Sequence, residues 1–560
     1  MKPSKRCLCL VALAAFVAWP AGAGAQNSAV EPKPRDMCAP PPGMVAPALP
    51  AKLLEGQGRL HLTITTSNPQ AQEFFNQGLA QMHSFWSNEA ERSFLQAAQL
   101  DPQCAMAYWG VAMAASGDYR PAFQLGRRND PPGRESPRKA SSERSSRQTS
   151  GATGRSGSQR ARDAAARALE LAGGVSTRER LYIEAVVARR NTQSANPIAD
   201  YIAALRKLVA AYPGELEAKT FLALATMNGY NHDKSPRPGT VESVALVREV
   251  LKANPDHFGA HHYIIHGLEG SSHPEDAWES CKRYPELVTN IPHALHMPGH
   301  IYVQSGRWDS AASSFEAAKR NEEKYLAGDA LYGYGHHGHN VLFLISTYGF
   351  QQRYDDAVRT SRELMGIPET PREAGNKNGS SAYRQGWFGM MRTLVRSEKW
   401  DDILAGQMLP DDSRFSEAAW RHWARGLSYA AKREPKPAKN ELKAMKKSLK
   451  QYRKAGDRVP AQLEAARVEL EGQIQAHGNT PAKGIKKMWQ AARMEAALEY
   501  SEPPIYPRPV LEALGRIAQT AGLTEEARRA FQQALAANPG SEVARRGLES
   551  RLQGPGSRLQ

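Results

Sequence analysis

Two stretches near opposite ends of the chain share one spacing of small and aromatic residues, and this spacing constrains the fold more than any other feature. In a unit that starts at Ala71, positions 8, 20, 24, 27 and 32 hold Gly78, Ala90, Phe94, Ala97 and Pro102. In a unit that starts at Arg508, the same positions hold Gly515, Ala527, Phe531, Ala534 and Pro539. Small residues let two helices touch, the aromatic ring fills the space between them, and the proline ends the second helix. The pattern predicts an all-α chain of helix–turn–helix units.

Related units follow through the middle of the chain. They begin at Leu224, Phe258, Pro292 and near Gly338. Pro236 and Pro238 interrupt the turn of the first of these units. Further helix pairs are expected at 384–405 and 418–456. A chain of such units predicts a helical solenoid, in which each unit packs on its neighbours.

These units resemble the tetratricopeptide-repeat (TPR) superfamily, whose period is 34 residues, from about residue 71 to 545. The segments H-H-Y-I-I-H-G-L-E, H-A-L-H-M-P-G-H-I-Y, H-N-V-L-F-L and E-P-P-I-Y-P are similar, more narrowly, to a group of exported bacterial TPR proteins with histidine-rich repeats and no established activity. The resemblance implies a right-handed superhelix. It also implies that positions 2, 5, 9, 12 and 13 of each first helix face a concave groove.

The histidines are the second constraint, because eleven of the 16 fall between His257 and His339. His262 and His266 are four residues apart, as are His296 and His300, so each pair lies on one face of a helix. The two pairs are 34 residues apart, which is one repeat. We therefore predict that imidazoles stack along one side of the solenoid.

The repeat register that the resemblance implies assigns a set of residues to the groove. They are Asn228, His232, His262, His266, Glu269, His293, His296, His300 and His339. His261 falls on a packing position, and His83 faces the groove far along the sequence from the others. Four histidines are expected to lie in solvated loops, namely His257, His273, His336 and His337.

Neighbouring helices pack with axes roughly 8–10 Å apart, so the two histidine pairs on adjacent first helices are placed to converge on one ion. The predicted metal ligands are His262, His266, His296 and His300, with Glu269 or a water completing the shell. Zinc, copper and iron all accept imidazole nitrogen. The other predicted contacts to a ligand are Asn228, His232, Glu269, His293 and His339. The alternative is that the histidines pack as hydrogen-bonded groups beside Tyr263 and Tyr302.

The start of the chain predicts export. Lys2, Lys5 and Arg6 precede an apolar run at 7–19, and Ala23-Gly24-Ala25 follows, as in a cleaved signal peptide. We expect a periplasmic or extracellular protein without a membrane-spanning helix. Cleavage leaves three of the five cysteines, too few for a disulfide scaffold. The net charge of +16 favours acidic ligands or anionic surfaces over nucleic acid.

The predicted organisation follows the chain in order. It comprises a signal peptide (1–25), a Pro-rich extended leader (26–70), N-terminal TPR helices (71–125), a disordered basic Ser/Arg-rich insertion (126–162), histidine-rich repeats (163–366), a loop (367–383), helical pairs (384–500), a C-terminal repeat (501–550) and a frayed tail (551–560). The insertion has too few apolar residues to fold. A local frameshift and a functional basic arm are the alternatives for it.

Two functions stay open at this stage. The first is an exported, non-catalytic TPR scaffold whose histidine-lined groove binds a protein, peptide or small ligand, with or without a metal ion. The second is a metal-dependent hydrolase or oxidoreductase, in which the metal acts as a Lewis acid or activates water. No H-E-x-x-H, P-loop or G-x-S-x-G motif is present to decide whether the protein is an enzyme. A basic helical face at 439–454 is predicted to be solvated. The alternative is weak contact with an anionic envelope surface.

Overall fold

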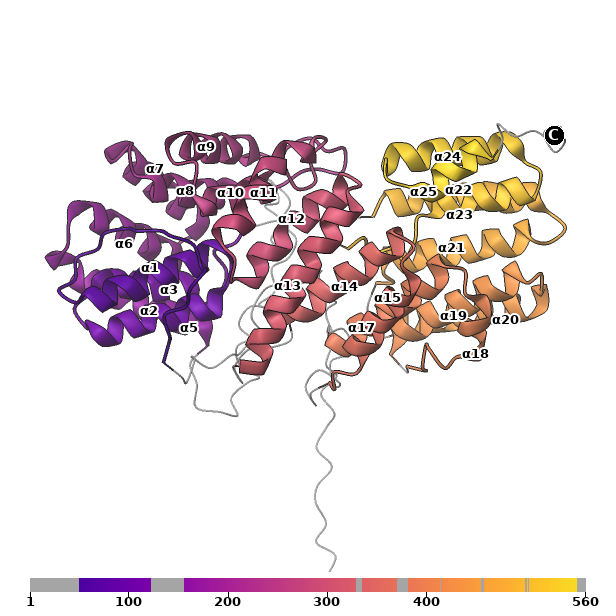
Figure 1. Cartoon of the computed structure of the whole chain (residues 1–560), viewed down its shortest axis with the longest axis horizontal. Helices are drawn as coiled ribbons and strands as arrows, with labels where there is room; N and C mark the ends of the chain where they lie inside the picture. The colour runs from indigo at the N-terminus through magenta and orange to yellow at the C-terminus, as the bar shows by residue number, and fades with distance from the viewer. Residues whose placement is uncertain are drawn as a thin grey trace, which may run out of the picture.

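The computed structural model describes residues 50–121, 156–328, 335–369, 381–412, 414–454, 458–498, 501 and 503–550. Within these ranges the chain forms helices and no named strand, which confirms the all-α prediction. The helices form one continuous array, with the N-terminal helices at one end, α12 to α14 in the middle and the C-terminal helices at the other end (Figure 1). Successive helices pair as antiparallel hairpins, so the fold is a TPR-like α-solenoid.

Three blocks of helices make up the array. The first contains α1 (Pro69–His83), α2 (Ser87–Leu100), α3 (Ala105–Ala114), α5 (Gly157–Leu171), α6 (Thr177–Arg190), α7 (Pro197–Ala211), α8 (Leu216–Thr226) and α9 (Thr240–Ala253). The second contains α10 (Phe258–Leu268), α11 (Trp278–Leu287), α12 (Pro292–Gln304), α13 (Trp308–Gly328), α14 (Gly335–Phe350) and α15 (Tyr354–Met365). The third contains α17 (Ala382–Arg396), α18 (Trp400–Ala405), α19 (Phe415–Ala431), α20 (Pro435–Lys454), α21 (Ala461–Ala476), α22 (Pro481–Ala496), α23 (Val510–Thr520), α24 (Thr524–Ala537) and α25 (Glu542–Glu549).

The contact between small and aromatic residues holds the predicted hairpins together. A Cβ added at Gly78 would lie 2.8 Å from the ring of Phe94, and one at Gly515 would lie 2.4 Å from the ring of Phe531. Gly299 and Phe315 repeat the contact at 2.3 Å in the hairpin of α12 and α13. Real Cβ contacts are never this short, so only glycine allows the two helices to approach so closely. The prediction that small residues mark helix contacts is therefore confirmed in all three hairpins.

The turns inside the hairpins also repeat. The second residue after the first helix takes a left-handed conformation at Phe85, Gly306, Gln352, Glu398, Arg433 and Gly522. The following backbone N–H bonds back to a carbonyl five residues earlier, as in Trp86 to Gln81 at 2.8 Å and Arg307 to Tyr302 at 2.8 Å. This pairing satisfies the last carbonyls of a helix. The turn type therefore accounts for the positive φ of Phe85. Among these six turn residues, Phe85 at the end of α1 is the aromatic one.

The repeat predicted from Leu224 is out of register. Its first helix is α8, which begins at Leu216 and ends at Thr226. Residues 227–239 then form a loop in which Gly229 and Gly239 have positive φ. Asn228 and His232 consequently lie in this loop and not on a groove-lining helix. Pro236 and Pro238 explain the error, because a proline removes a backbone donor and disfavours helix at the preceding residue.

The leader and the insertion each need one correction. Residues 50–68 form neither a helix nor a strand, yet Leu62 and Ile64 are buried in the core and Thr65 donates its N–H to Glu179 at 2.6 Å. Helix α5 begins at Gly157, inside the stretch expected to be disordered. The signal peptide, the first part of the leader, most of the insertion and the tail lie outside the described residues. No helix in the part of the chain that the structure describes is long and apolar enough to cross a membrane.

Candidate metal centre

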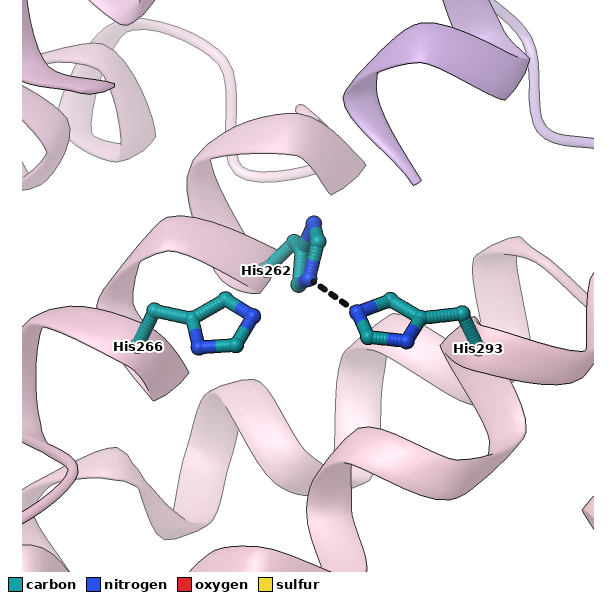
Figure 2. Close-up of side chains that lie close together, drawn as sticks. All are labelled: His262, His266 and His293. Carbon is teal, nitrogen blue, oxygen red and sulfur yellow. Dashed lines mark hydrogen bonds between the residues drawn. The ribbon is translucent and has the colours of Figure 1, made fainter. Parts of the chain in front are cut away.

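Helix α10 carries the first histidine pair. The helix begins at Phe258, where the Nδ1 atom of His257 accepts the N–H of Ala260 at 3.1 Å, and it ends before Glu269. His262 and His266 project from one face of α10 toward His293, which lies in the first turn of α12. Figure 2 shows the three rings turned toward one another from these two helices. One nitrogen from each ring lies within 4.8 Å of the other two, so the three can hold one ion.

A second group of three histidines lies beside the first. His296 and His300 stand four residues apart on α12, and His339 comes from α14. Their candidate ligand atoms also lie within 4.8 Å of one another. The structure thus brings together the four predicted metal ligands, but it divides them between two groups. His293 completes the group on α10, which we call group A, and His339 completes the group on α12, which we call group B.

The hydrogen bonds of group A assign the protons on its rings. The Nδ1 atom of His262 lies 2.5 Å from the carbonyl oxygen of His83, so Nδ1 is the donor. His336 donates its Nδ1 proton to the carboxylate of Glu322, and its Nε2 lies 3.3 Å from Nδ1 of His293. With His336 neutral, His293 donates from Nδ1 to that atom, and both His262 and His293 keep the lone pair on Nε2.

Group B follows the same rule. His300 donates from Nδ1 to Glu269 at 3.0 Å. His296 donates from Nδ1 to the amide oxygen of Asn340 at 2.8 Å, and the amide nitrogen of Asn340 donates to the carbonyl of Phe315 and to Glu322. Both rings therefore carry a lone pair on Nε2. His339 has a buried Nδ1 atom with no hydrogen-bond partner.

In each group, two Nε2 atoms lie close together. The Nε2 atoms of His262 and His293 are 3.2 Å apart, and those of His296 and His300 are 2.7 Å apart. When both rings of a pair are neutral with the proton on Nδ1, both Nε2 atoms are acceptors, and a cation between them would remove their repulsion. Two imidazole nitrogens bound to one tetrahedral ion at 2.0–2.1 Å are roughly 3.3 Å apart, close to the spacing in group A. The spacing in group A therefore fits metal ligation.

The environment disfavours protonation of five of the six rings. None of the six histidines is more than 8% exposed. Burial holds the pKa of His262, His293, His296 and His339 well below the ordinary value, because the imidazolium loses its hydration, and it lowers the pKa of His266 as well. Neutral imidazole is also the form that binds metals.

A phenylalanine ring covers each group. The ring of Phe85 is 4.5 Å from that of His262 and 5.2 Å from that of His266, measured between centroids. Phe343 lies 4.7 Å from His300 and 4.9 Å from His339. Helix α1 also packs against α10, so the curvature of the chain encloses group A between distant segments. Low polarity around the rings strengthens the electrostatic interactions of any charge held there.

Several polar residues of the centre differ from their predicted roles. His257 and His337 are buried, and His336 is mostly buried, although all three were predicted to be solvated. His273 is exposed as predicted. Glu269 accepts hydrogen bonds from two ligand histidines, so it orients the rings. Glu322 and Asn340 were not predicted, because Glu322 lies on α13 and meets His336 and Asn340 of α14 through the packing of the two helices.

His83 and His261 are also informative. His83 was predicted to face the groove far along the sequence from the others, and its carbonyl accepts from His262 while its ring pairs with Glu217 at 2.7 Å. His261 fits the packing position that was predicted. Its Nδ1 lies 3.0 Å from Ser280 and its Nε2 lies 2.8 Å from the carbonyl of Pro255, so both nitrogens are occupied away from the groups.

Comparisons with known proteins give a fold likeness only. No protein-family model matches the sequence, and neither does any curated protein sequence. Among solved structures, the chain is similar to the APC/C hetero-tetramer Cut9-Hcn1, at 12% identity over 88% of this chain and 79% of that chain, with a TM-score of 0.29. It is also similar to a human IFIT1 dimer with PPP-AAAA, at 12% identity over 86% and 89% of the two chains, with a TM-score of 0.30. Likenesses this remote carry no argument about function.

Proposed function

We propose that the protein binds transition-metal ions in groups A and B, inside a TPR-like solenoid. The observation that carries the proposal is the convergence of three buried histidines in each group, whose ligand atoms all lie within 4.8 Å of one another. In group A the Nε2 atoms of His262 and His293 are 3.2 Å apart, close to the spacing of two nitrogens on one tetrahedral ion.

The donor set favours a particular class of ion. All candidate ligand atoms are neutral imidazole nitrogens, and no cysteine belongs to either group. Such ligands suit zinc, copper and iron and do not suit magnesium or calcium. Three protein ligands also leave a coordination position for water or a small ligand, as in catalytic zinc sites. This open position supports the metal-dependent enzyme as the next function to test, and export through the N-terminal signal remains part of the proposal.

A second candidate is recognition of a partner or small ligand, which the repeat scaffold supports. A cleft of about 610 Å³ lies between the turn of α12 and α13 and the C-terminal hairpin. Its lining combines the stacked rings of Trp308 and Phe350 with Arg545 and Arg546. Binding at this cleft would not need the histidines, and so it would survive their replacement.

Metal analysis tests the first proposal. Chelator-treated protein is titrated with Zn(II), Cu(II) and Fe(II), and the bound metal is measured after desalting by mass spectrometry of the elements. We expect up to two ions per chain for at least one of these metals. His262→Ala should remove one ion by disabling group A, and His300→Ala should remove the other by disabling group B.

His261→Ala is the matched control, because this buried histidine is the neighbour of His262 on α10 and has both nitrogens occupied elsewhere. We expect His261→Ala to retain both ions. A wild-type chain that retains no stoichiometric metal, or an equal loss of metal in the His261 and His262 variants, would contradict the proposal.

A further inference from the structure

Glu269 contacts both histidine groups. One carboxylate oxygen accepts the Nδ1 proton of His266 in group A at 2.9 Å, and the other accepts that of His300 in group B at 3.0 Å. The side chain is only 7% exposed. One carboxylate therefore lies between the two groups and contacts both of them.

Glu322 joins the same two groups on another side. It accepts a proton from His336, and His336 in turn accepts from His293 of group A. Its other oxygen accepts from the amide of Asn340 at 3.2 Å, and Asn340 in turn accepts from His296 of group B. Glu322 is fully buried, so these contacts replace water around its charge. Glu269 thus connects the two groups directly, and Glu322 connects them through His336 and Asn340.

Helix α12 fixes the groups relative to each other. It supplies His293 to group A and both His296 and His300 to group B, all within its 13 residues. The ring centroids of His293 and His296 are 6.1 Å apart. With metal–nitrogen bonds of 2.0–2.1 Å, two ions held by these rings lie within about 12 Å of each other.

We infer that groups A and B form one dinuclear metal centre, in which two divalent transition-metal ions share Glu269 and Glu322 as orienting carboxylates. This inference rests on the proposed metal-binding function and adds the coupling between the sites. The shared charges offset the repulsion between two adjacent cations. A carboxylate that accepts the N–H of a metal-bound imidazole also fixes the ring and makes it a better ligand. Glu269 does this directly for both ions, whereas Glu322 acts on them through His336 and Asn340.

Spectroscopy of the wild-type chain tests the inference without relying on a variant that must bind both ions. Cu(II) is added as a paramagnetic probe to one and to two equivalents, and electron paramagnetic resonance spectra are recorded. We expect dipolar broadening at two equivalents, because the two spins are close. The reference spectra come from His262→Ala and His300→Ala, each loaded with one equivalent. Two bound ions whose spectrum equals the sum of these references would overturn the dinuclear centre while leaving metal binding in place.

A second test uses Glu269→Gln and Zn(II) competition with a chromophoric chelator. The amide nitrogen of glutamine cannot accept, so one of the two imidazoles loses its acceptor and the remaining one loses a charged acceptor. Outer hydrogen-bond partners of metal ligands contribute about 10–100-fold to affinity. We expect both dissociation constants to rise by about that factor. An effect confined to one ion, or no effect, would overturn the inference.

The matched control is Glu217→Gln. Glu217 is also a buried carboxylate between two imidazoles, His83 at 2.7 Å and His257 at 3.2 Å, but neither belongs to a candidate metal group. We expect this variant to keep both Zn(II) affinities within a few-fold of wild type. Thermal unfolding of both metal-free variants shows whether they fold. If the wild-type chain binds no metal in the first place, the proposed function fails and the inference fails with it.

Discussion

The two halves of the solenoid each bury a polar centre, and the two centres differ in how their donors and acceptors match. In the C-terminal half, the carboxylate of Glu469 on α21 accepts from Tyr506 at 2.6 Å, Arg508 at 2.9 Å, Trp423 at 3.2 Å and Gln473 at 3.0 Å. A negative group there faces donors, one of them a cation. In the histidine centre, on α10, α12 and α14, the Nε2 atoms of two imidazole pairs lie 3.2 Å and 2.7 Å apart. The first centre gathers donors around one acceptor, and the second gathers candidate metal ligands.

This difference shows how a structural network can be told from a binding site on the same scaffold. Burial alone does not separate them, because Glu469 and His262 are both fully buried. Clustering does not separate them either. The kind of group that meets does, because the Glu469 centre joins donors to an acceptor, whereas the histidine centre brings six imidazoles together.

The largest effect is expected from Glu469→Ala, which removes the acceptor of the polar centre in the C-terminal half. The substitution leaves Arg508, which is 7% exposed, as an unpaired buried charge. Removal of one partner of a buried ion pair costs about 3–5 kcal/mol. We expect a loss of that size in urea unfolding monitored by tryptophan fluorescence, with unchanged metal content. Loss of metal in this variant would show that the two centres are not independent.

Glu471→Ala provides the control on the same helix. Glu471 pairs with Lys446 at 2.7 Å and Lys487 at 2.9 Å, but it is only partly buried. Exposed pairs contribute about 0–1 kcal/mol. Equal losses for Glu469→Ala and Glu471→Ala would contradict the view that the network around Glu469 stabilises the C-terminal half.

A smaller, pH-dependent effect is expected at Glu495, close to the same network. Its carboxyl group accepts the first N–H of α23, from Val510, at 2.8 Å. Burial, with added repulsion from Glu469 and Glu512 that Arg508 only partly offsets, raises its pKa from 4.5 to about 8. Between these values the folded chain keeps a proton that the unfolded chain releases. The stability gained from this group is therefore complete below pH 4.5 and is lost as the pH rises through 8.

The test is urea unfolding of wild type and Glu495→Gln at pH 5 and pH 8. Glutamine mimics the neutral acid, so Glu495→Gln should lose less stability than wild type between pH 5 and pH 8. Because Glu495 as a whole is only half-buried, we expect the two losses in free energy of unfolding to differ by about 1–2 kcal/mol. Parallel pH profiles for the two proteins would show that Glu495 is ionised in the folded state.

Sequence spacing was enough to predict the all-α repeat fold. The Gly78–Phe94 and Gly515–Phe531 contacts were predicted from positions 8 and 24 of a repeat, because a close helix crossing needs a small residue opposite a large one. The register failed where prolines lengthened a turn. Helices α10 and α12 begin 34 residues apart, whereas α8 and α10 begin 42 residues apart. A repeat rule that is local in sequence cannot anticipate an inserted loop.

The site was predicted only in part. The i, i+4 pairs on α10 and α12 followed from helix geometry, and His293 and His339 were predicted as groove residues. The division into two groups depends on the angles between three helices, which no spacing encodes. The carbonyl of His83 lies 179 positions before His262, and it reaches the site only because α1 packs on α10. Partners contributed by such long-range contacts leave no periodic signal in a single sequence.

Replacement of His232 is expected to have the smallest effect. It tests most directly whether the predicted repeat register or the observed fold gives the position of this residue. On the predicted repeats, His232 and His266 occupy the same position of consecutive units. In the fold, His232 is exposed in the loop after α8, whereas His266 is buried in group A. We expect His232→Ala to change the free energy of unfolding by less than about 0.5 kcal/mol and to leave the metal content unchanged, because it removes no buried contact. His266→Ala should remove the ion of group A. Equal loss of metal in the two variants would mean that residues 227–239 fold back onto the histidines, and that the register predicted from the sequence describes the protein better than α8 does.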